Sequence, residues 1–187
     1  MAIKIYIDQG HNPQNPNAGA EGNGLREQDI VFAVGIELAE LLRQNGNFDV
    51  RLSRPTAQSQ IGTSNTTSLR LRVADANEWG ADYFISLHTN ASSIESATGT
   101  EGFAFSSPST AFSLGEDILD GISRLTGLRN RGMAVRTNLY VLRRTAMPAV
   151  LIELGFITNY NDAMLMSNRP DLFARGIYDG IVEYTGI

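Results

Sequence analysis

Short apolar runs alternate with longer amphipathic stretches along this chain of 187 residues. Runs bounded by turn residues predict β-strands at residues 3–10, 48–53, 82–87, 101–106, 139–142 and 149–153. Apolar residues at helical spacing predict helices at about 26–45, 66–79, 109–126 and 171–184, with a short one near 162. Because strands and helices alternate, we expect an α/β fold with a mostly parallel, twisted sheet of about six strands and helices on both faces.

The first predicted helix carries an acidic residue on its apolar side. Gly46 follows this helix and is suited to cap its C-terminus. Glu27 lies four residues before Val31 and seven before Val34, so helical spacing places it on the buried stripe, in the first turn. A carboxylate in that position needs a cation or a hydrogen-bond partner.

The composition is typical of one globular domain, which we place at residues 1–187. With 42% hydrophobic and 19% charged residues, a chain of this length buries about 70% of the surface that its unfolded form exposes. The chain contains no cysteine, so a bound metal has to use histidine, aspartate or glutamate. The net charge of −5 argues against binding to nucleic acid.

Three chemically capable side chains stand at the ends of predicted strands. The only two histidines, His11 and His88, each directly follow an apolar run, and a third run ends at Glu153. In open α/β sheets, ligands bind in the crevice beyond the carboxyl ends of the strands. We therefore expect these three side chains to converge on one active site.

Six blocks of sequence form a recognisable series along nearly the whole chain. They are IDQGH at 7–11, GLRE at 24–27, SR at 53–54, LRLRVADAN at 69–77, ADYFISLHTNA at 81–91 and PAVLIELGFITN at 148–159. The series resembles the signature blocks of zinc-dependent N-acetylmuramoyl-L-alanine amidases, the bacterial cell-wall hydrolases. One departure is local: Asn12 and Pro13 stand where that family usually has a second glycine after the first histidine. This position shapes a loop and supplies no ligand.

The resemblance implies a zinc site and a catalytic glutamate. In that family, one zinc ion is held by a histidine after the first strand, a glutamate at the start of the first helix and a histidine after a central strand. The matching residues in this chain are His11, Glu27 and His88, and the catalytic glutamate of a late strand matches Glu153. The implied reaction is hydrolysis of the amide bond between the lactyl group of N-acetylmuramic acid and L-alanine in peptidoglycan.

The residue types suit this chemistry. Two histidines and one glutamate are a known ligand set for catalytic zinc, which leaves the fourth tetrahedral position for water. Zinc lowers the pKa of its water to about 7 and polarises the carbonyl group under attack. We expect Glu153 to take a proton from the water and to return it to the leaving amine.

Each candidate also has a plainer interpretation. A histidine after a strand often serves only as a hydrogen-bonding loop residue, and an acid in a first turn favours the helix dipole. Glu153 would alternatively form a buried ion pair with Arg54 or Arg72. For the whole protein, the alternatives are a non-catalytic peptidoglycan-binding module on the same fold and a zinc carboxypeptidase or aminopeptidase.

Six arginines lie close together in an otherwise acidic sequence, at Arg124, Arg129, Arg131, Arg136, Arg143 and Arg144. Scattered charges usually form a solvated face. Because this segment precedes the predicted catalytic strand, Arg129 and Arg131 are predicted to bind carboxylates of the stem peptide. Asn90, close to His88 in the sequence, is predicted as a further substrate contact.

We expect peptidoglycan or muropeptides as the binding partner. The chain begins Met1-Ala2-Ile3-Lys4 and passes directly into a strand, and it contains no apolar run of about 18 residues. The sequence therefore predicts neither a signal peptide nor membrane insertion. Action at the cell wall would then require that the chain is the catalytic domain of a larger secreted protein, or that it is released by lysis. A wall-targeting module would lie outside it.

Overall fold

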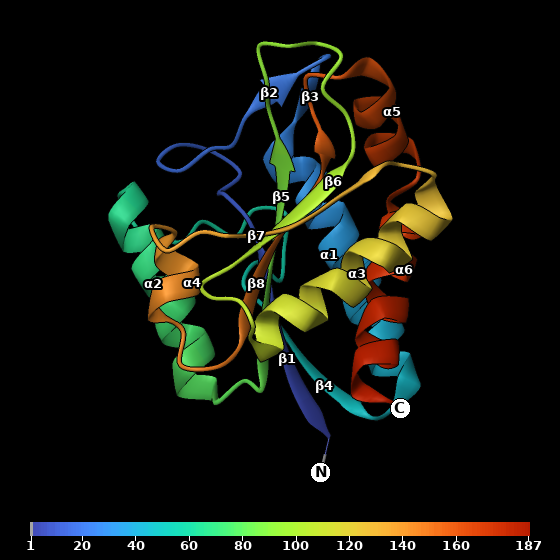
Figure 1. Ribbon diagram of the computed structural model, residues 1–187. Coiled ribbons are helices and arrows are strands. Elements are labelled where there is room, and N and C mark those ends of the chain that lie inside the picture. Colours follow the sequence, from blue (N-terminus) through green and yellow to red (C-terminus); the bar gives the residue numbers. More distant parts are fainter. Residues whose placement is uncertain (1) are drawn as a thin grey trace.

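A twisted sheet of six strands runs through the centre of the molecule (Figure 1), and the computed structural model describes residues 2–187. The strands are β1 (Ile3–Gln9), β4 (Phe48–Leu52), β5 (Tyr83–Asn90), β6 (Thr100–Ala104), β7 (Asn130–Val135) and β8 (Ala149–Phe156). Their order is β4-β1-β5-β8-β6-β7, and every neighbouring pair is parallel except β6 with β8. The predicted single-domain α/β class and the mostly parallel sheet are confirmed.

Helices cover both faces of this sheet, as predicted (Figure 1). One face carries α1 (Glu27–Asn45), α3 (Thr110–Thr126) and α6 (Pro170–Thr185). The other carries α2 (Asn65–Trp79) and the short α4 (Tyr140–Arg144), while α5 (Tyr160–Asn168) follows the end of β8. Within residues 2–187, no helix combines the length and the apolar character that a membrane span requires.

Alternating side chains of the strands divide the core into two layers. On β1, Ile5 and Ile7 are fully buried in the layer that contains α1, α3 and α6. Tyr6 points to the opposite layer, where its ring stacks on Phe84 of β5 with 5.4 Å between the ring centroids. Because both faces are covered, the strands are nearly continuous apolar runs, which is the pattern from which they were predicted.

Local signals set the ends of the helices close to the predicted positions. Ser64 caps α2 in a reciprocal capping box with Thr67, which satisfies free backbone N–H groups of the first turn. Ser109 caps α3 in a similar way with its side chain alone. Gly46 ends α1 with a φ of 80°, a left-handed conformation that glycine adopts without a steric penalty.

The predicted strand at 139–142 is wrong, because this segment forms the helix α4. Val141 and Leu142 are buried there against the layer of α2, and a short apolar run does not distinguish such a turn of helix from a strand. The sixth strand is instead β7, with the sequence NRGMAV. Its half-exposed, polar and glycine-containing sequence reflects its place at the edge of the sheet, which is why the apolar pattern missed it.

The segment between β1 and α1 contains a small hairpin, β2 (Glu21–Gly22) with β3 (Leu25–Arg26), which the sequence pattern did not predict. Two-residue strands are too short to leave a periodic signal. The hairpin stands at the end of the sheet where β1, β5 and β8 finish, and both chain termini lie at the opposite end (Figure 1). The carboxyl ends of β1, β5 and β8, next to the hairpin, are therefore the place where the sequence predicts the active site.

Candidate active site

The backbone after β1 brings His11 against the end of β5. Gly10 leaves no room for a side chain, because a Cβ atom there would lie 2.5 Å from Cε1 of His88 and 2.6 Å from the carbonyl oxygen of Leu87. His11 itself has a φ of 64°, which is uncommon for residues other than glycine and is a form of backbone strain that clusters at functional sites. The two imidazole rings meet edge to face with their centroids 4.9 Å apart.

Glu27, the first residue of α1, lies between the two histidines. Its Oε1 atom is 3.2 Å from Nε2 of His11 and 3.0 Å from Nδ1 of His88, and its side chain is only 3% exposed. The backbone N–H groups of Ala20 and Thr89 each donate a hydrogen bond of 2.9 Å to its carboxylate. These contacts fix the carboxylate, so Glu27 is more than a surface acid at the positive end of a helix.

Glu27 and His88 stabilise each other's charged forms, and His11 also stabilises the ionised form of Glu27. Burial acts to raise the pKa of Glu27, but the hydrogen bonds and charges of His11 and His88 outweigh it and hold that pKa well below its usual range. Burial likewise acts to lower the pKa of His88, and the hydrogen bond and charge of Glu27 outweigh it and raise that pKa. An ionised carboxylate therefore lies between two imidazoles at neutral pH.

The residues fit a metal ion of the zinc type. One ligand atom from each of His11, Glu27 and His88 can be chosen so that all three atoms lie within 4.8 Å of one another. Two imidazole nitrogens and a carboxylate oxygen are a donor set that suits zinc and leaves a coordination position open. Nε2 of His11 is the ring nitrogen that faces Glu27, while its Nδ1 is buried without a hydrogen-bond partner among residues 2–187.

Glu153 joins the same site from β8. It pairs in register with His88 of the neighbouring parallel strand β5, and Thr100 donates a hydrogen bond of 2.8 Å to its backbone carbonyl. The Oε2 atom of Glu153 is buried, and no atom of residues 2–187 forms a hydrogen bond with it. A buried carboxylate oxygen without a partner is costly, which marks this residue for a functional role.

The surroundings of Glu153 favour its protonated form. Burial raises the pKa of Glu153 to about 7, and the positive charge of His88 opposes this rise. The negative charges of Glu27 and Glu101 reinforce it, while the charge of Arg136 acts against it. A carboxyl group that titrates near neutral pH can both accept and donate a proton.

The alternative ion pair of Glu153 with Arg54 or Arg72 is wrong. Arg72 instead donates a hydrogen bond of 2.6 Å to Asp8 within β1, and it also donates to the backbone carbonyl of His11. Arg54 donates to the backbone carbonyls of Gln28 at 2.9 Å and Ala57 at 3.3 Å. Both buried arginines therefore support the backbone around the site and leave Glu153 free.

Two of the predicted substrate contacts, Asn90 and Arg131, bind the same residue, Glu101, which the sequence did not indicate. Glu101 on β6 accepts a hydrogen bond from Nδ2 of Asn90 and another, of 3.4 Å, from Nε of Arg131. Its Cα atom pairs with that of Glu153 across the antiparallel strands β6 and β8. Arg129, the other predicted contact, is exposed and donates to none of these residues.

A cavity of about 130 Å³ lies directly beside the two histidines. Its lining combines both imidazoles and Arg72 with aliphatic side chains of α2, α4 and β8, and consists of Asp8, Gly10, His11, Asn17, Leu69, Arg72, His88, Leu139, Tyr140, Val141 and Leu151. The segment 139–142, which forms a helix and not the predicted strand, therefore contributes to the wall of the site. An apolar hollow next to charged groups is typical of a substrate-binding cleft.

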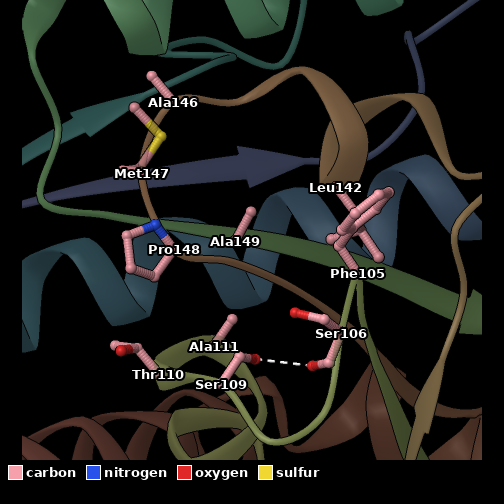
Figure 2. Close-up of a pocket in the computed structure, with 10 residues that line it drawn as sticks. All are labelled: Phe105, Ser106, Ser109, Thr110, Ala111, Leu142, Ala146, Met147, Pro148 and Ala149. Atoms are coloured by element: carbon pink, nitrogen blue, oxygen red, sulfur yellow. Dashed lines mark hydrogen bonds between the residues drawn. The ribbon is translucent and has the colours of Figure 1, made fainter.

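A second hollow, of about 330 Å³, lies around the start of β8, at Pro148 and Ala149 (Figure 2). Figure 2 shows that apolar side chains and the hydroxyl groups of Ser106, Ser109 and Thr110 line it, with Ser109 bonded to the backbone carbonyl of Ser106. None of its lining residues is ionisable. The chemically capable groups therefore gather at the opposite end of β8, around Glu153.

Comparison with known proteins places this geometry in a family. Residues 5–183 match the family described as N-acetylmuramoyl-L-alanine amidase. The chain is 37% identical over 188 residues to the N-acetylmuramoyl-L-alanine amidase CwlM of Bacillus licheniformis, in an alignment that covers 97% of this chain and 68% of that protein.

Solved structures agree with the sequence comparison. The catalytic domain of the amidase CwlV from Bacillus (Paenibacillus) polymyxa var. colistinus is similar with a TM-score of 0.85 and 30% identity, over 99% of both chains. An N-acetylmuramoyl-L-alanine amidase from Clostridium difficile 630 is similar with a TM-score of 0.88 and 29% identity, over 99% of this chain and 97% of that one. The match over nearly the full length, in sequence and in fold, shows that this chain belongs to the N-acetylmuramoyl-L-alanine amidases, a family of cell-wall peptidoglycan hydrolases.

Proposed function

We propose that this chain is a zinc-dependent amidase that hydrolyses the bond between the lactyl group of N-acetylmuramic acid and L-alanine. The observation that carries this proposal is the convergence of His11, Glu27 and His88 beside a buried carboxylate, Glu153, that has an unpartnered oxygen. The three converging residues would hold one zinc ion per chain. When bound, zinc supplies Lewis-acid chemistry, because it acidifies water and polarises the amide carbonyl.

The remaining steps belong to the residues of the chain. Glu153 accepts the proton of the attacking water at its free oxygen and then donates it to the nitrogen of the leaving alanine. Its pKa of about 7 suits both halves of this transfer. Glu27 stays ionised throughout, because its own pKa is held low, and Arg72 keeps the backbone of His11 in place.

Two alternative functions have less support. A peptidoglycan-binding module on this fold would gain nothing from a buried carboxylate oxygen without a hydrogen-bond partner, and such a group costs free energy. A zinc carboxypeptidase or aminopeptidase would use a similar ligand set but must bind a free chain terminus. The family match favours the lactyl amide bond over a terminal peptide bond.

The substrate would be whole peptidoglycan or its muropeptide fragments at the cell wall. The predicted substrate contacts remain Asn90, Arg129 and Arg131. Asn90 and Arg131 both donate hydrogen bonds to Glu101, which holds their side chains in place. The alignment with CwlM covers 68% of that longer protein. We therefore propose that wall targeting, where it occurs, comes from a separate module outside residues 1–187.

Digestion of purified peptidoglycan tests the proposed function. We expect the enzyme to release N-terminal alanine in step with the loss of wall turbidity, while reducing sugar ends stay at background. A chelator should abolish this release, and added zinc should restore it, because the metal supplies the Lewis acid.

Three results would contradict the proposal. New reducing ends would indicate a glycosidase, which needs a different pair of carboxylates. New amino groups on residues other than alanine would indicate a peptidase. Full activity in a preparation shown by metal analysis to contain no zinc would refute the metal dependence.

A further inference from the structure

The arginines near the candidate site differ in how far their charge is already compensated. Nε of Arg131 donates to the carboxylate of Glu101 at 3.4 Å, and its Nη1 donates to the backbone carbonyl of Thr98 at 3.2 Å. Its guanidinium also packs over the ring of Phe156 at 5.2 Å. The charge of Arg131 is therefore already compensated in part by Glu101.

Arg136 is different, because its guanidinium forms no hydrogen bond or ion pair with any of residues 2–187. It follows β7, and its backbone N–H donates a hydrogen bond of 2.9 Å to the carbonyl of Ala104 at the end of β6. The guanidinium lies 4.6 Å from the ring centroid of Phe103 on β6. An aromatic face holds the planar cation in place and leaves its N–H groups free to donate.

The position of Phe103 puts this cation on the side of the sheet that carries Glu153. Phe103 pairs with Leu151 across β6 and β8, and Glu153 follows Leu151 by two residues on the same face. The charge of Arg136 acts on Glu153 in the expected direction, since it opposes the rise of that pKa. Arg129 makes no contact of this kind with β6 or β8 side chains.

The segment that carries Arg136 also forms part of the wall beside the metal ligands. Leu139, Tyr140 and Val141 follow Arg136 and line the 130 Å³ cavity together with His11 and His88. A substrate bound in this cavity with its scissile amide beside the histidines would bring its next residues towards the segment that carries Arg136. Charge and shape thus favour an anionic group at that point.

We propose that Arg136 is a substrate-binding residue that binds a free carboxylate of the stem peptide, close to the scissile bond. This inference rests on the proposed function and adds the residue that selects between acidic and amidated stems. The fork of a guanidinium matches a carboxylate with two parallel N–H···O hydrogen bonds, which lysine and glutamine do not reproduce.

Kinetics on two matched muropeptides test this proposal, one with free stem carboxylates and one with amidated ones. Arg136→Gln should raise the KM for the acidic substrate about tenfold, as loss of a charge-assisted pair predicts. Its KM for the amidated substrate should stay within about twofold, and kcat should change little on either. Arg136→Lys should give a KM for the acidic substrate between those of the wild type and Arg136→Gln, because it keeps the charge but loses the fork.

Arg144→Gln is the matched control, because it removes the same charge from an exposed position at the end of α4. The backbone carbonyl of Arg144, which the substitution keeps, accepts a hydrogen bond from Asn77 of α2. Arg144→Gln should leave KM and kcat unchanged for both substrates. The proposal is overturned if Arg136→Gln affects both substrates equally, or if Arg131→Gln discriminates between them and Arg136→Gln does not. Wild-type enzyme that cleaves neither muropeptide would instead refute the proposed function, and this inference with it.

Discussion

At the scale of single residues, two glutamates of the same site are placed in opposite electrostatic environments. Both are buried, which by itself raises the pKa of a carboxyl group. Glu27 receives hydrogen bonds from His11, His88 and backbone N–H groups, so it stays ionised. Glu153 has an oxygen without any such partner, and its pKa rises to about 7. The contrast matches the roles proposed for them, Glu27 as a metal ligand and Glu153 as the group that moves protons.

This contrast predicts different results for the same substitution at the two positions. Glu153→Gln should keep one zinc ion per chain and a native fold, while turnover falls by about 100-fold or more, because an amide cannot accept the proton. Glu27→Gln should lose most of the zinc, because the anionic ligand is gone. Metal analysis and kinetics on the same preparations measure both effects.

The residue-level prediction has two clear ways to be wrong. Loss of zinc from Glu153→Gln would make Glu153 a ligand. Full zinc occupancy in Glu27→Gln would assign Glu27 a structural role, in which its carboxylate accepts hydrogen bonds from the backbone N–H groups of Ala20 and of Thr89 on β5.

At the scale of elements, one arginine of α2 connects the helix to the end of β1. Arg72 is 2% exposed and donates to Asp8 and to the carbonyl groups of Gln9 and His11. Ser86 of β5 donates to the second oxygen of Asp8 at 2.8 Å. A buried pair with this many hydrogen bonds fixes the position from which His11 leaves the strand.

The Asp8–Arg72 pair predicts how stability depends on pH. Burial acts to raise the pKa of Asp8, but the charge and hydrogen bonds of Arg72 outweigh it and hold the pKa below its ordinary value of 3.8. A lowered pKa in the folded state stabilises the protein above the unfolded value, and this contribution is lost as the pH falls through the folded value. Asp8→Asn should therefore cost about 3–5 kcal/mol of unfolding free energy at neutral pH.

Denaturant unfolding at a series of pH values measures this effect. The difference between wild type and Asp8→Asn should shrink as the pH falls below about 4, where Asp8 of the unfolded wild-type chain begins to bind a proton while the folded form still resists protonation. A difference that stays constant down to low pH would show that the cost arises from altered packing and that the ion pair contributes little.

The sequence allows most of these elements to be predicted, because each buried strand is an apolar run and each helix has a periodic stripe. It also indicates His11, His88 and Glu153 as candidate site residues, since each stands at the end of such a run. It does not identify Glu101, because the antiparallel placement of β6 beside β8 arises from tertiary topology and leaves no local pattern. For a related reason, the apolar run at 139–142 predicts a strand where the structure has a helix: burial against α2 makes a helical turn as apolar as a strand.

At the scale of the whole molecule, the topology gathers one chemical group from each of several strands at a single end of the sheet. The order β5-β8-β6-β7 places Asn90, Glu153, Glu101 and Arg131 on four neighbouring strands. The net charge of −5 means that an anionic substrate is not attracted by the protein as a whole. Local cations such as Arg136 therefore have to provide the attraction.

The most direct test of the central claim is hydrolysis of purified peptidoglycan in water enriched in oxygen-18, followed by mass spectrometry of the products. Attack of water on the lactyl carbonyl predicts one oxygen-18 atom in the lactyl carboxylate that stays on the glycan, and none in the released peptide. Label in a carboxyl group of the peptide would indicate a peptidase, and label at a reducing sugar end would indicate a glycosidase. Either result would contradict the amidase reaction proposed for this site.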